Sequence, residues 1–147
     1  VKGSVTHFEC RENGAIVNAT NEFCLGGGGV DGAINRLGGA KMISDWLLLP
    51  VLEESKLANS ERSLSIRCQT GTAVVTGPNE YGSLRVPYVI HAAGPSYRES
   101  CEFETPDQQP QSTYRASLDC CREKSIQQVA FSLISAGIYR GERNLND

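Results

Sequence analysis

Short apolar segments rich in β-branched residues recur along the chain and alternate with stretches whose apolar positions have helical spacing. The strand-like segments lie at 1–6, 15–17, 72–76, 88–92 and 129–134,. Helical spacing runs from 31 to 58, where Gly38-Gly39 and Pro50 divide it into two or three pieces, and again from 112 to 124,. Segments 55–69 and 99–111 are polar and predict surface loops,. This alternation predicts an α/β fold built on a layered sheet.

Length and charge limit the kinds of partner. The chain has 147 residues, 39% of them hydrophobic and 21% charged, which is typical of one globular domain,. With 14 Lys and Arg against 17 Asp and Glu the net charge is -3, and no basic cluster is dense enough to neutralise a run of phosphates,. There is no apolar run of membrane-spanning length and no signal pattern at the start,. We therefore expect no direct nucleic-acid partner, no membrane association and an intracellular location, cytoplasmic or nuclear.

The cysteines and histidines do not form a metal-binding pattern. The six cysteines include no C-x-x-C, and the adjacent pair Cys120-Cys121 cannot close an ordinary disulfide within one helix,. The two histidines, His7 and His91, have no zinc-type spacing to the cysteines,. We expect reduced thiols, no metal and no cofactor. Cys24 is expected to serve packing, and His91 is expected to be a core residue.

Four consecutive glycines, residues 26–29, separate a short strand from a helix that begins at about Asp31. Bare amides can point into one concavity without obstruction by side chains, and the helix N-terminus adds partial positive charge. A flexible turn is the alternative, but four glycines cost backbone entropy that a turn does not require. The glycine run therefore favours a site for an anion such as phosphate or diphosphate.

Two familiar phosphate-binding motifs resemble this segment in part. The nucleotide triphosphatase pattern is excluded, because no Lys-Ser or Lys-Thr follows the glycines,. Gly27, Gly29 and Gly32 satisfy G-x-G-x-x-G, and Glu53 has the spacing of a ribose-binding acid,. However, the polar segment 18–25 intervenes between strand and glycines, whereas in a dinucleotide-binding turn they follow the strand at once. The alternative interpretation of the chain as a dinucleotide-dependent oxidoreductase depends on this literal match alone.

The stretch "AIVNATNEFCLGGGGVDGAI" resembles the signature of the macrodomain family, which binds ADP-ribose. In that signature an Asn is followed, after six intervening residues, by Gly-Gly, a branched residue and Asp, here Asn21 and then 28–31. The likeness extends through 1–6, 71–77, 86–95 and 131–145, while 41–69 is longer than the usual connection. The resemblance implies a single macrodomain over 1–147, with a three-layer α/β/α fold and a mixed central sheet.

The resemblance also implies two walls around a diphosphate. One wall would be Gly28, Gly29 and Val30, and the other, ending beside the distal ribose, would be Ser135, Ala136, Gly137, Ile138 and Tyr139. The second segment independently suits an anion site, because it follows an apolar strand and contains small residues. Asn21 would hydrogen-bond the distal ribose hydroxyls. Ser4, Val5 and Ala19 are further ligand-binding candidates.

The chain is similar to the hydrolysing, MacroD-type branch of the family in keeping both Asn21 and Asp31. This similarity implies removal of mono-ADP-ribose from acidic side chains, deacetylation of O-acetyl-ADP-ribose, or both, with water as nucleophile and no metal. The partners would be ADP-ribose, an ADP-ribosylated protein or O-acetyl-ADP-ribose. Asn21 and Asp31 are the catalytic candidates, with Asp31 orienting the water as a modest base that improves once substrate is bound. The alternatives are a helix cap without chemical role at Asp31, and a module that binds ADP-ribose without cleaving it.

Two departures from the family pattern concern the adenine end of the ligand. Ser4 stands where the family usually has an Asp that accepts a hydrogen bond from the adenine amino group, and a hydroxyl accepts more weakly than a carboxylate,. The family also continues past the second wall into another strand and helix, whereas this chain stops at Asp147. We expect the chain to be a piece that lacks these C-terminal elements, and adenine recognition to be altered.

Overall fold

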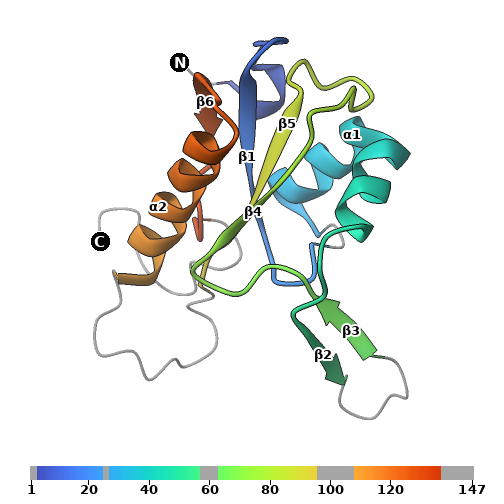
Figure 1. Ribbon diagram of the computed structural model, residues 1–147, viewed down its shortest axis with the longest axis vertical. Helices are drawn as coiled ribbons and strands as arrows, with labels where there is room; N and C mark the ends of the chain where they lie inside the picture. Colours follow the sequence, from blue (N-terminus) through green and yellow to red (C-terminus); the bar gives the residue numbers. More distant parts are fainter. Residues whose placement is uncertain (1–2, 25–26, 57–62, 96–107, 137–147) are drawn as a thin grey trace.

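The computed structural model describes residues 3–24, 27–56, 63–95 and 108–136 (Figure 1). Helical elements are η1 (Val5–His7), a single 3₁₀ turn, and the α-helices α1 (Gly29–Leu47) and α2 (Gln108–Glu123). The strands are β1 (Gly14–Thr20), β2 (Glu53–Lys56), β3 (Ser63–Ile66), β4 (Ala73–Thr76), β5 (Tyr88–Ala93) and β6 (Gln128–Phe131).

A mixed sheet with strand order β4-β5-β1-β6 forms the middle layer. β1 pairs in parallel with β5 on one side and with β6 on the other, and β4 is antiparallel to β5. Helices α1 and α2 cover opposite faces of this sheet (Figure 1). The predicted α/β/α architecture with a mixed sheet is therefore confirmed.

Alternation along β1 divides the core into two apolar layers. Ala15 and Val17 belong to a cluster with Cys120 and Cys121 of α2. Ile16, between them, belongs to a cluster with Ile34 of α1. Because successive side chains of a strand point to opposite faces, this short apolar strand anchors both helices.

The strand predicted at 1–6 is wrong over its described residues. Ser4 instead caps the 3₁₀ turn η1, its hydroxyl accepting a hydrogen bond from the Thr6 amide at 3.3 Å and lying 2.7 Å from the Thr6 hydroxyl. Serine side chains compete with sheet hydrogen bonding by bonding to nearby backbone. The β-branched residues of this segment were a misleading signal, because the local cap decides its conformation.

The loop predicted at 55–69 contains strand structure. Glu53–Lys56 and Ser63–Ile66 pair as an antiparallel hairpin, which projects away from the main sheet (Figure 1). Most of its side chains are at least partly exposed, so it lacks the apolar alternation that identifies a half-buried strand,. The loop predicted at 99–111 is likewise wrong at its end, because α2 begins at Gln108.

The remaining elements agree with the predictions apart from their ends. β4 and β5 occupy the predicted segments 72–76 and 88–92, and β6 begins one residue early and ends at Phe131, short of 134. β1 is longer than predicted and reaches Thr20. α1 comprises two helical pieces that meet at Gly39, whose φ of 65° and ψ of -165° are not helical, so the interruption predicted at the glycine pair is confirmed. The helical spacing predicted to reach residue 58 is wrong at its end, because Glu53–Lys56 forms strand β2.

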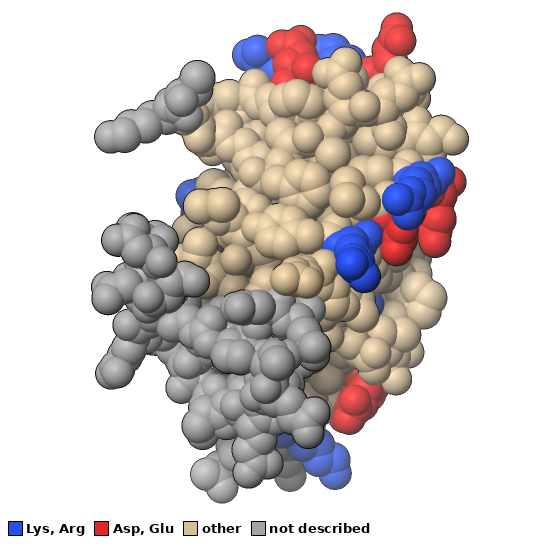
Figure 2. Space-filling view, turned by 90° about the vertical axis from the view of Figure 1, so that its left-hand side faces the viewer, with Lys and Arg blue, Asp and Glu red and all other residues tan. Residues whose placement is uncertain are grey.

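The described residues include no membrane-spanning helix, and those on the face in Figure 2 form no continuous basic area. Within the described ranges, no helix combines the length and the apolar character needed to cross a membrane. Among the described residues on the face in Figure 2, Lys and Arg side chains are scattered and several lie beside acidic ones. This face therefore does not present the dense positive charge that would follow a nucleic-acid backbone.

Candidate functional site

Two segments that lie far apart in sequence meet at one edge of the sheet. β1 and β6 are parallel neighbours, so their carboxyl ends lie at the same edge. The segment after β1 leads through Gly27 and Gly28 into α1, and the segment after β6 runs through 132–136. Ligands of open α/β sheets bind outside the carboxyl ends of the strands.

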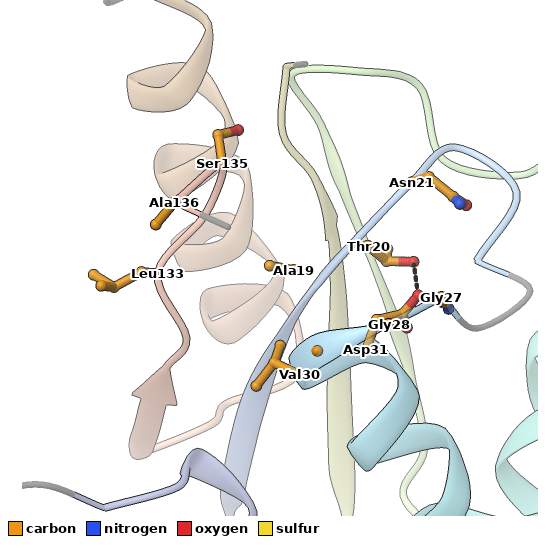
Figure 3. Close-up of a pocket in the computed structure, with 11 residues that line it drawn as sticks. Ala19, Thr20, Asn21, Gly27, Gly28, Val30, Asp31, Leu133, Ser135 and Ala136 are labelled. Atoms are coloured by element: carbon orange, nitrogen blue, oxygen red, sulfur yellow. Dashed lines mark hydrogen bonds between the residues drawn. The ribbon is translucent and has the colours of Figure 1, made fainter. Parts of the chain in front are cut away.

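A cavity of about 360 Å³ lies between these two segments (Figure 3). Its lining comes from the end of β1, the start of α1 and the segment after β6: Ala19, Thr20, Asn21, Gly27, Gly28, Gly29, Val30, Asp31, Leu133, Ser135 and Ala136. Eight of the residues predicted for the site are among them, namely Ala19, Asn21, Gly28, Gly29, Val30, Asp31, Ser135 and Ala136.

Some predicted residues are not brought to this cavity. Ser4 and Val5 are absent from its lining, and Val5 packs against the cluster that contains Ile16. Gly137, Ile138 and Tyr139 lie outside the described residues. Glu53, the ribose-binding acid of the dinucleotide alternative, sits in the β2–β3 hairpin and is also absent from the lining.

Two lining residues, Thr20 and Leu133, were not predicted, and Gly27 was predicted only as part of the glycine run. Thr20 and Gly27 lie within the signature stretch, so their proximity to Asn21 and Gly28 was an available signal. Leu133 lies outside that stretch, in the segment after β6, and its side chain is 75% exposed. An apolar side chain left open beside a cavity is a common feature of ligand sites.

The first wall is held by contacts between the glycine run and the first turn of α1. The Gly27 amide donates to the Asp31 carboxylate at 2.9 Å. Gly32 lies under this contact, and a Cβ there would be only 2.4 Å from the Gly27 carbonyl oxygen. Glycine is therefore required at Gly32 so that the run can fold back on the helix, which leaves exposed backbone at Gly28 and Gly29 on the cavity side.

The second wall is tied to three other elements by hydrogen bonds. The Ser132 hydroxyl donates to the Val17 carbonyl at 2.7 Å and accepts from the Ala19 amide at 3.2 Å, which extends the contact between β6 and β1. The Ile134 amide donates to the Tyr114 hydroxyl at 3.1 Å. The Ser135 hydroxyl donates to the Pro95 carbonyl at 2.7 Å. The position of this wall is thus fixed by strand, helix and loop together.

Asp31 is the charged group among the described residues that line the cavity, and its carboxylate accepts four hydrogen bonds. Oδ1 accepts from Asn18 Nδ2 at 2.8 Å and from Asn35 Nδ2 at 2.7 Å. Oδ2 accepts from the Gly27 amide at 2.9 Å and from the Thr20 hydroxyl at 3.2 Å (Figure 3). A carboxylate offers about four lone-pair positions. The ligand-free site therefore leaves Asp31, which is 5% exposed, fully hydrogen-bonded.

Asn21 is engaged by the turn that follows it. Its Oδ1 accepts from the Phe23 amide at 3.0 Å and from the Cys24 amide at 2.9 Å. Figure 3 shows its side chain directed toward this turn and away from Ser135 and Ala136. The amide nitrogen Nδ2 is the part of the side chain left to bond a ligand, so Asn21 offers a donor rather than the donor and acceptor expected from sequence.

The positive potential of the site comes from the backbone, because the charged side chain among its described lining residues is the Asp31 carboxylate. No Lys or Arg lines the cavity among its described residues. An anion here would be held by amides of the glycine run and by the positive end of α1. The same arrangement suits a ligand with a diphosphate between two neutral ends.

Nearby thiols are not activated. Cys24 is buried next to Trp46, and burial raises the pKa of its thiol to about 12. The described cysteines, Cys10, Cys24, Cys68, Cys120 and Cys121, are all unpaired. Within the part of the chain that the structure describes, no three His, Cys, Asp or Glu side chains are grouped to hold a metal ion.

Comparisons with known proteins agree on one family. The family model described as "Macro domain" matches residues 17–144. A macro domain-containing protein of Caldanaerobacter subterraneus is 37% identical over 139 residues, which cover 95% of this chain and 68% of that protein. O-acetyl-ADP-ribose deacetylase 2 of Pantoea vagans is 34% identical, with coverages of 95% and 70%.

Solved structures give the same result. The Trypanosoma brucei macrodomain in complex with ADP-ribose superposes with a TM-score of 0.69 at 30% identity, covering 96% of this chain and 48% of that chain. The chain thus spans about half the length of this structural relative and 68% and 70% of the two curated relatives.

Proposed function

The chain belongs to the macrodomain family, and from that premise we propose that it binds ADP-ribose in the cavity between the two walls. We propose further that it removes mono-ADP-ribose from acidic side chains, deacetylates O-acetyl-ADP-ribose, or does both, without a metal. The observation that carries the proposal is that 27–31 and 133–136, although distant in sequence, line one cavity at the carboxyl ends of β1 and β6.

In the binding mode that we propose, the diphosphate lies between Gly28, Gly29 and Val30 on one side and Ser135 and Ala136 on the other. Exposed backbone on the first wall and the N-terminus of α1 support this placement,. The distal ribose lies toward Asn21 and Asp31. The proposed roles of Ser4 and Val5 at the adenine end, and of 137–139 beside the ribose, come from the family resemblance.

The proposed chemistry is hydrolysis of an ester on the distal ribose. For an ADP-ribosylated acidic side chain, water attacks the anomeric carbon and the side-chain carboxylate leaves; for O-acetyl-ADP-ribose, water attacks the acetyl carbonyl carbon, and acetate and the ribose hydroxyl are released. Asn21 donates from Nδ2 to a ribose hydroxyl, because its Oδ1 already accepts two backbone amides. Asp31 orients the water through Oδ2. To do so it exchanges the Thr20 hydroxyl, whose bond of 3.2 Å is long for a hydroxyl on a carboxylate, for the water,. In this proposal Asp31 is a modest base that becomes a better one once substrate is bound.

The names of relatives support a hydrolytic activity. Proteins of Pantoea vagans and Cronobacter turicensis that are 34% and 35% identical to this chain are named O-acetyl-ADP-ribose deacetylases. The bond that they hydrolyse lies on the same ribose that the proposed site holds. At this identity the names favour the chemistry without specifying the substrate of this chain.

The second candidate function is a module that binds ADP-ribose without cleaving it. The four hydrogen bonds on the Asp31 carboxylate favour it, because a saturated carboxylate can hold the glycine run and have no chemical role,. The two functions differ in whether ADP-ribose is released.

One experiment separates the candidates. The chain is incubated with a protein mono-ADP-ribosylated on acidic residues, and free ADP-ribose is measured, with calorimetry of ADP-ribose binding alongside. Release of ADP-ribose supports the enzyme. Binding heat without release supports the binding module. Absence of both release and binding heat contradicts both candidate functions. Asp31→Ala and Asn21→Ala are expected to lower turnover at least tenfold, while the exposed, cavity-distant Asp119→Asn retains it. Wild-type turnover in Asp31→Ala would remove Asp31 from the mechanism.

A further inference from the structure

Four buried side-chain atoms in the described part of the chain have no hydrogen-bond partner: Asn18 Oδ1, Trp46 Nε1, Arg67 Nε and His91 Nδ1. They lie in one region. Asn18 and His91 are direct Cα partners across the β1–β5 pairing, so their side chains share a face of the sheet,. The Arg67 guanidinium lies 4.6 Å from the centre of the Trp46 ring. Two of the four atoms, Trp46 Nε1 and His91 Nδ1, belong to residues that line one cavity.

A second cavity, of about 100 Å³, lies in this region between the sheet and α1. Its lining includes both His91 and Trp46, together with Cys24, Asn35, Met42 and Ile43. It shares no lining residue with the ADP-ribose cavity. Since a water molecule takes up roughly 30 Å³ in the liquid, this space suits about three.

The two aromatic side chains offer complementary groups. The Thr76 hydroxyl donates to the Val89 carbonyl at 3.3 Å and lies 3.0 Å from His91 Nε2. Nε2–H of a neutral imidazole then donates to the Thr76 oxygen, which leaves Nδ1 as a bare acceptor. Burial keeps the ring neutral by lowering the pKa of His91 to about 4. The indole of Trp46 can only donate, and the interaction partner that it has in the described structure is the Cys24 thiol, whose sulfur is a weak acceptor outside hydrogen-bond geometry,. A molecule that both donates and accepts satisfies His91 and Trp46 together.

The region is connected to Asp31 by two amides. Asn35, which lines the cavity, donates from Nδ2 to Asp31 Oδ1 at 2.7 Å and to the Asp31 carbonyl at 2.9 Å. Asn18 donates from Nδ2 to the same Oδ1 at 2.8 Å. In both side chains the amide nitrogen therefore faces Asp31, and the amide oxygen does not take part in these hydrogen bonds.

We propose that the second cavity is an internal hydration site, in which one to three ordered waters accept from Trp46 Nε1 and donate to His91 Nδ1. Hydration is favoured because a buried polar group without a partner costs about 1–3 kcal/mol, while ordering a water costs about 0–2 kcal/mol. Waters in this site also lie beside Asn35, whose amide nitrogen donates to Asp31 Oδ1 at 2.7 Å. The site does not depend on ADP-ribose being the ligand.

Nuclear magnetic resonance of the full chain, without ligand, tests this directly. The sequence contains one Trp and two His, so the indole proton of Trp46 gives a single signal and the His91 ring nitrogens need to be distinguished only from those of His7. We expect a nuclear Overhauser cross-peak between the indole proton and long-lived water, and an unprotonated, hydrogen-bonded Nδ1 in His91. An indole proton without a water cross-peak, or a proton on His91 Nδ1, overturns the proposal.

A matched pair of variants adds an independent control. The Asn side chain places its amide near the position of His Nδ1, whereas the longer Gln amide reaches the position of Nε2. His91→Asn is therefore expected to keep the water cross-peak of Trp46, and His91→Gln to lose most of it. Equal cross-peaks in both variants would contradict a water bridged by Nδ1. If either variant fails to fold, the measurement on the unmodified chain still decides.

Discussion

At the scale of single residues, the site depends on how Asp31 is surrounded. Its carboxylate is shared by donors from β1, from the glycine run and from α1. The carboxylate thereby links the end of β1 to the first wall of the cavity. Whether it also acts on water depends on Thr20, because the Thr20 hydroxyl occupies the position on Oδ2 that the proposed water requires.

Two substitutions of Thr20 distinguish the loss of its hydroxyl from the loss of room for a water at Asp31. Thr20→Ala removes the hydroxyl and leaves room for water at Asp31 Oδ2, so turnover on O-acetyl-ADP-ribose is expected to stay at or above the wild-type value. Thr20→Val removes the same hydroxyl but fills its place with a methyl group, so turnover is expected to fall about tenfold or more, equivalent to about 1.4 kcal/mol. An equal loss in both variants would mean that the hydroxyl itself is needed.

Gly28 provides a second test at this scale. A Cβ at Gly28 would meet no protein atom within 4 Å, and the backbone there has an ordinary φ of -83°. Gly28→Ala is thus expected to leave the melting temperature unchanged, yet to weaken ADP-ribose binding about tenfold, because its methyl group intrudes between the amides and the diphosphate. Gly3→Ala, at another glycine with open space around its Cβ, is the control. Unchanged affinity in Gly28→Ala would move the diphosphate away from this wall.

The residues of the site could be predicted from sequence only as far as the backbone pattern reaches. The glycine run and the spacing from Asn21 to Asp31 are local features that mark the first wall, whereas Ala19, Ser135 and Ala136 were predicted from the family resemblance. The partners of Asp31 could not be found this way, because the contact with Asn18 depends on how β1 lies under α1. The turn that occupies Asn21 Oδ1 is a side-chain conformation, which residue spacing does not fix.

At the scale of elements, the connection from β1 to α1 is what creates the site, and α1 itself is shaped by Gly39. The interruption that the sequence predicted at Gly38-Gly39 is present, because the non-helical dihedral angles of Gly39 divide α1 into two pieces. The hairpin β2–β3 was missed because its strands are short, polar and mostly exposed, so burial left no pattern in them,. Apolar alternation predicts only those strands that pack on a core.

The interruption at Gly39 gives a stability prediction. Gly39 has φ 65° and ψ -165°, a conformation that is essentially restricted to glycine, while a Cβ there would meet no atom within 4 Å,. Gly39→Ala is therefore expected to lower the free energy of unfolding by about 1–3 kcal/mol through backbone strain alone. Denaturant unfolding measures the change, with Gly3→Ala as the reference. A change below about 0.5 kcal/mol would mean that α1 straightens at no cost.

At the scale of the whole molecule, parallel pairing of β1 with β5 and β6 places both walls at one edge and the buried polar residues behind them. The layered architecture could be predicted from sequence because each strand of the main sheet is apolar. Strand order could not be derived from alternation, because pairing between distant segments leaves no local mark. The family resemblance implied a mixed central sheet, and the order β4-β5-β1-β6 comes from the structure. The interior of this layer contains His91, whose state links stability to pH.

The lowered pKa of His91 predicts a loss of stability in acid. Because burial lowers its pKa from 6.5 to about 4, the unfolded chain binds a proton over this window and the folded chain does not,. The contribution of His91 is complete above about pH 6.5 and is lost as the pH falls toward 4, by on the order of 3 kcal/mol. Urea unfolding at pH 7, 5.5 and 4.5 is expected to show a shallower pH dependence in His91→Gln than in the unmodified chain. Parallel curves would contradict a neutral, buried His91.

The claim on which the account depends is that the two walls close on ADP-ribose. Isothermal titration of the chain with ADP-ribose, run in parallel with Gly28→Ala, tests it most directly. We predict saturable binding with one ligand per chain that weakens about tenfold in the variant while its melting temperature stays the same. Absence of binding heat in the folded, unmodified chain, or identical affinities for the two proteins, would contradict the account.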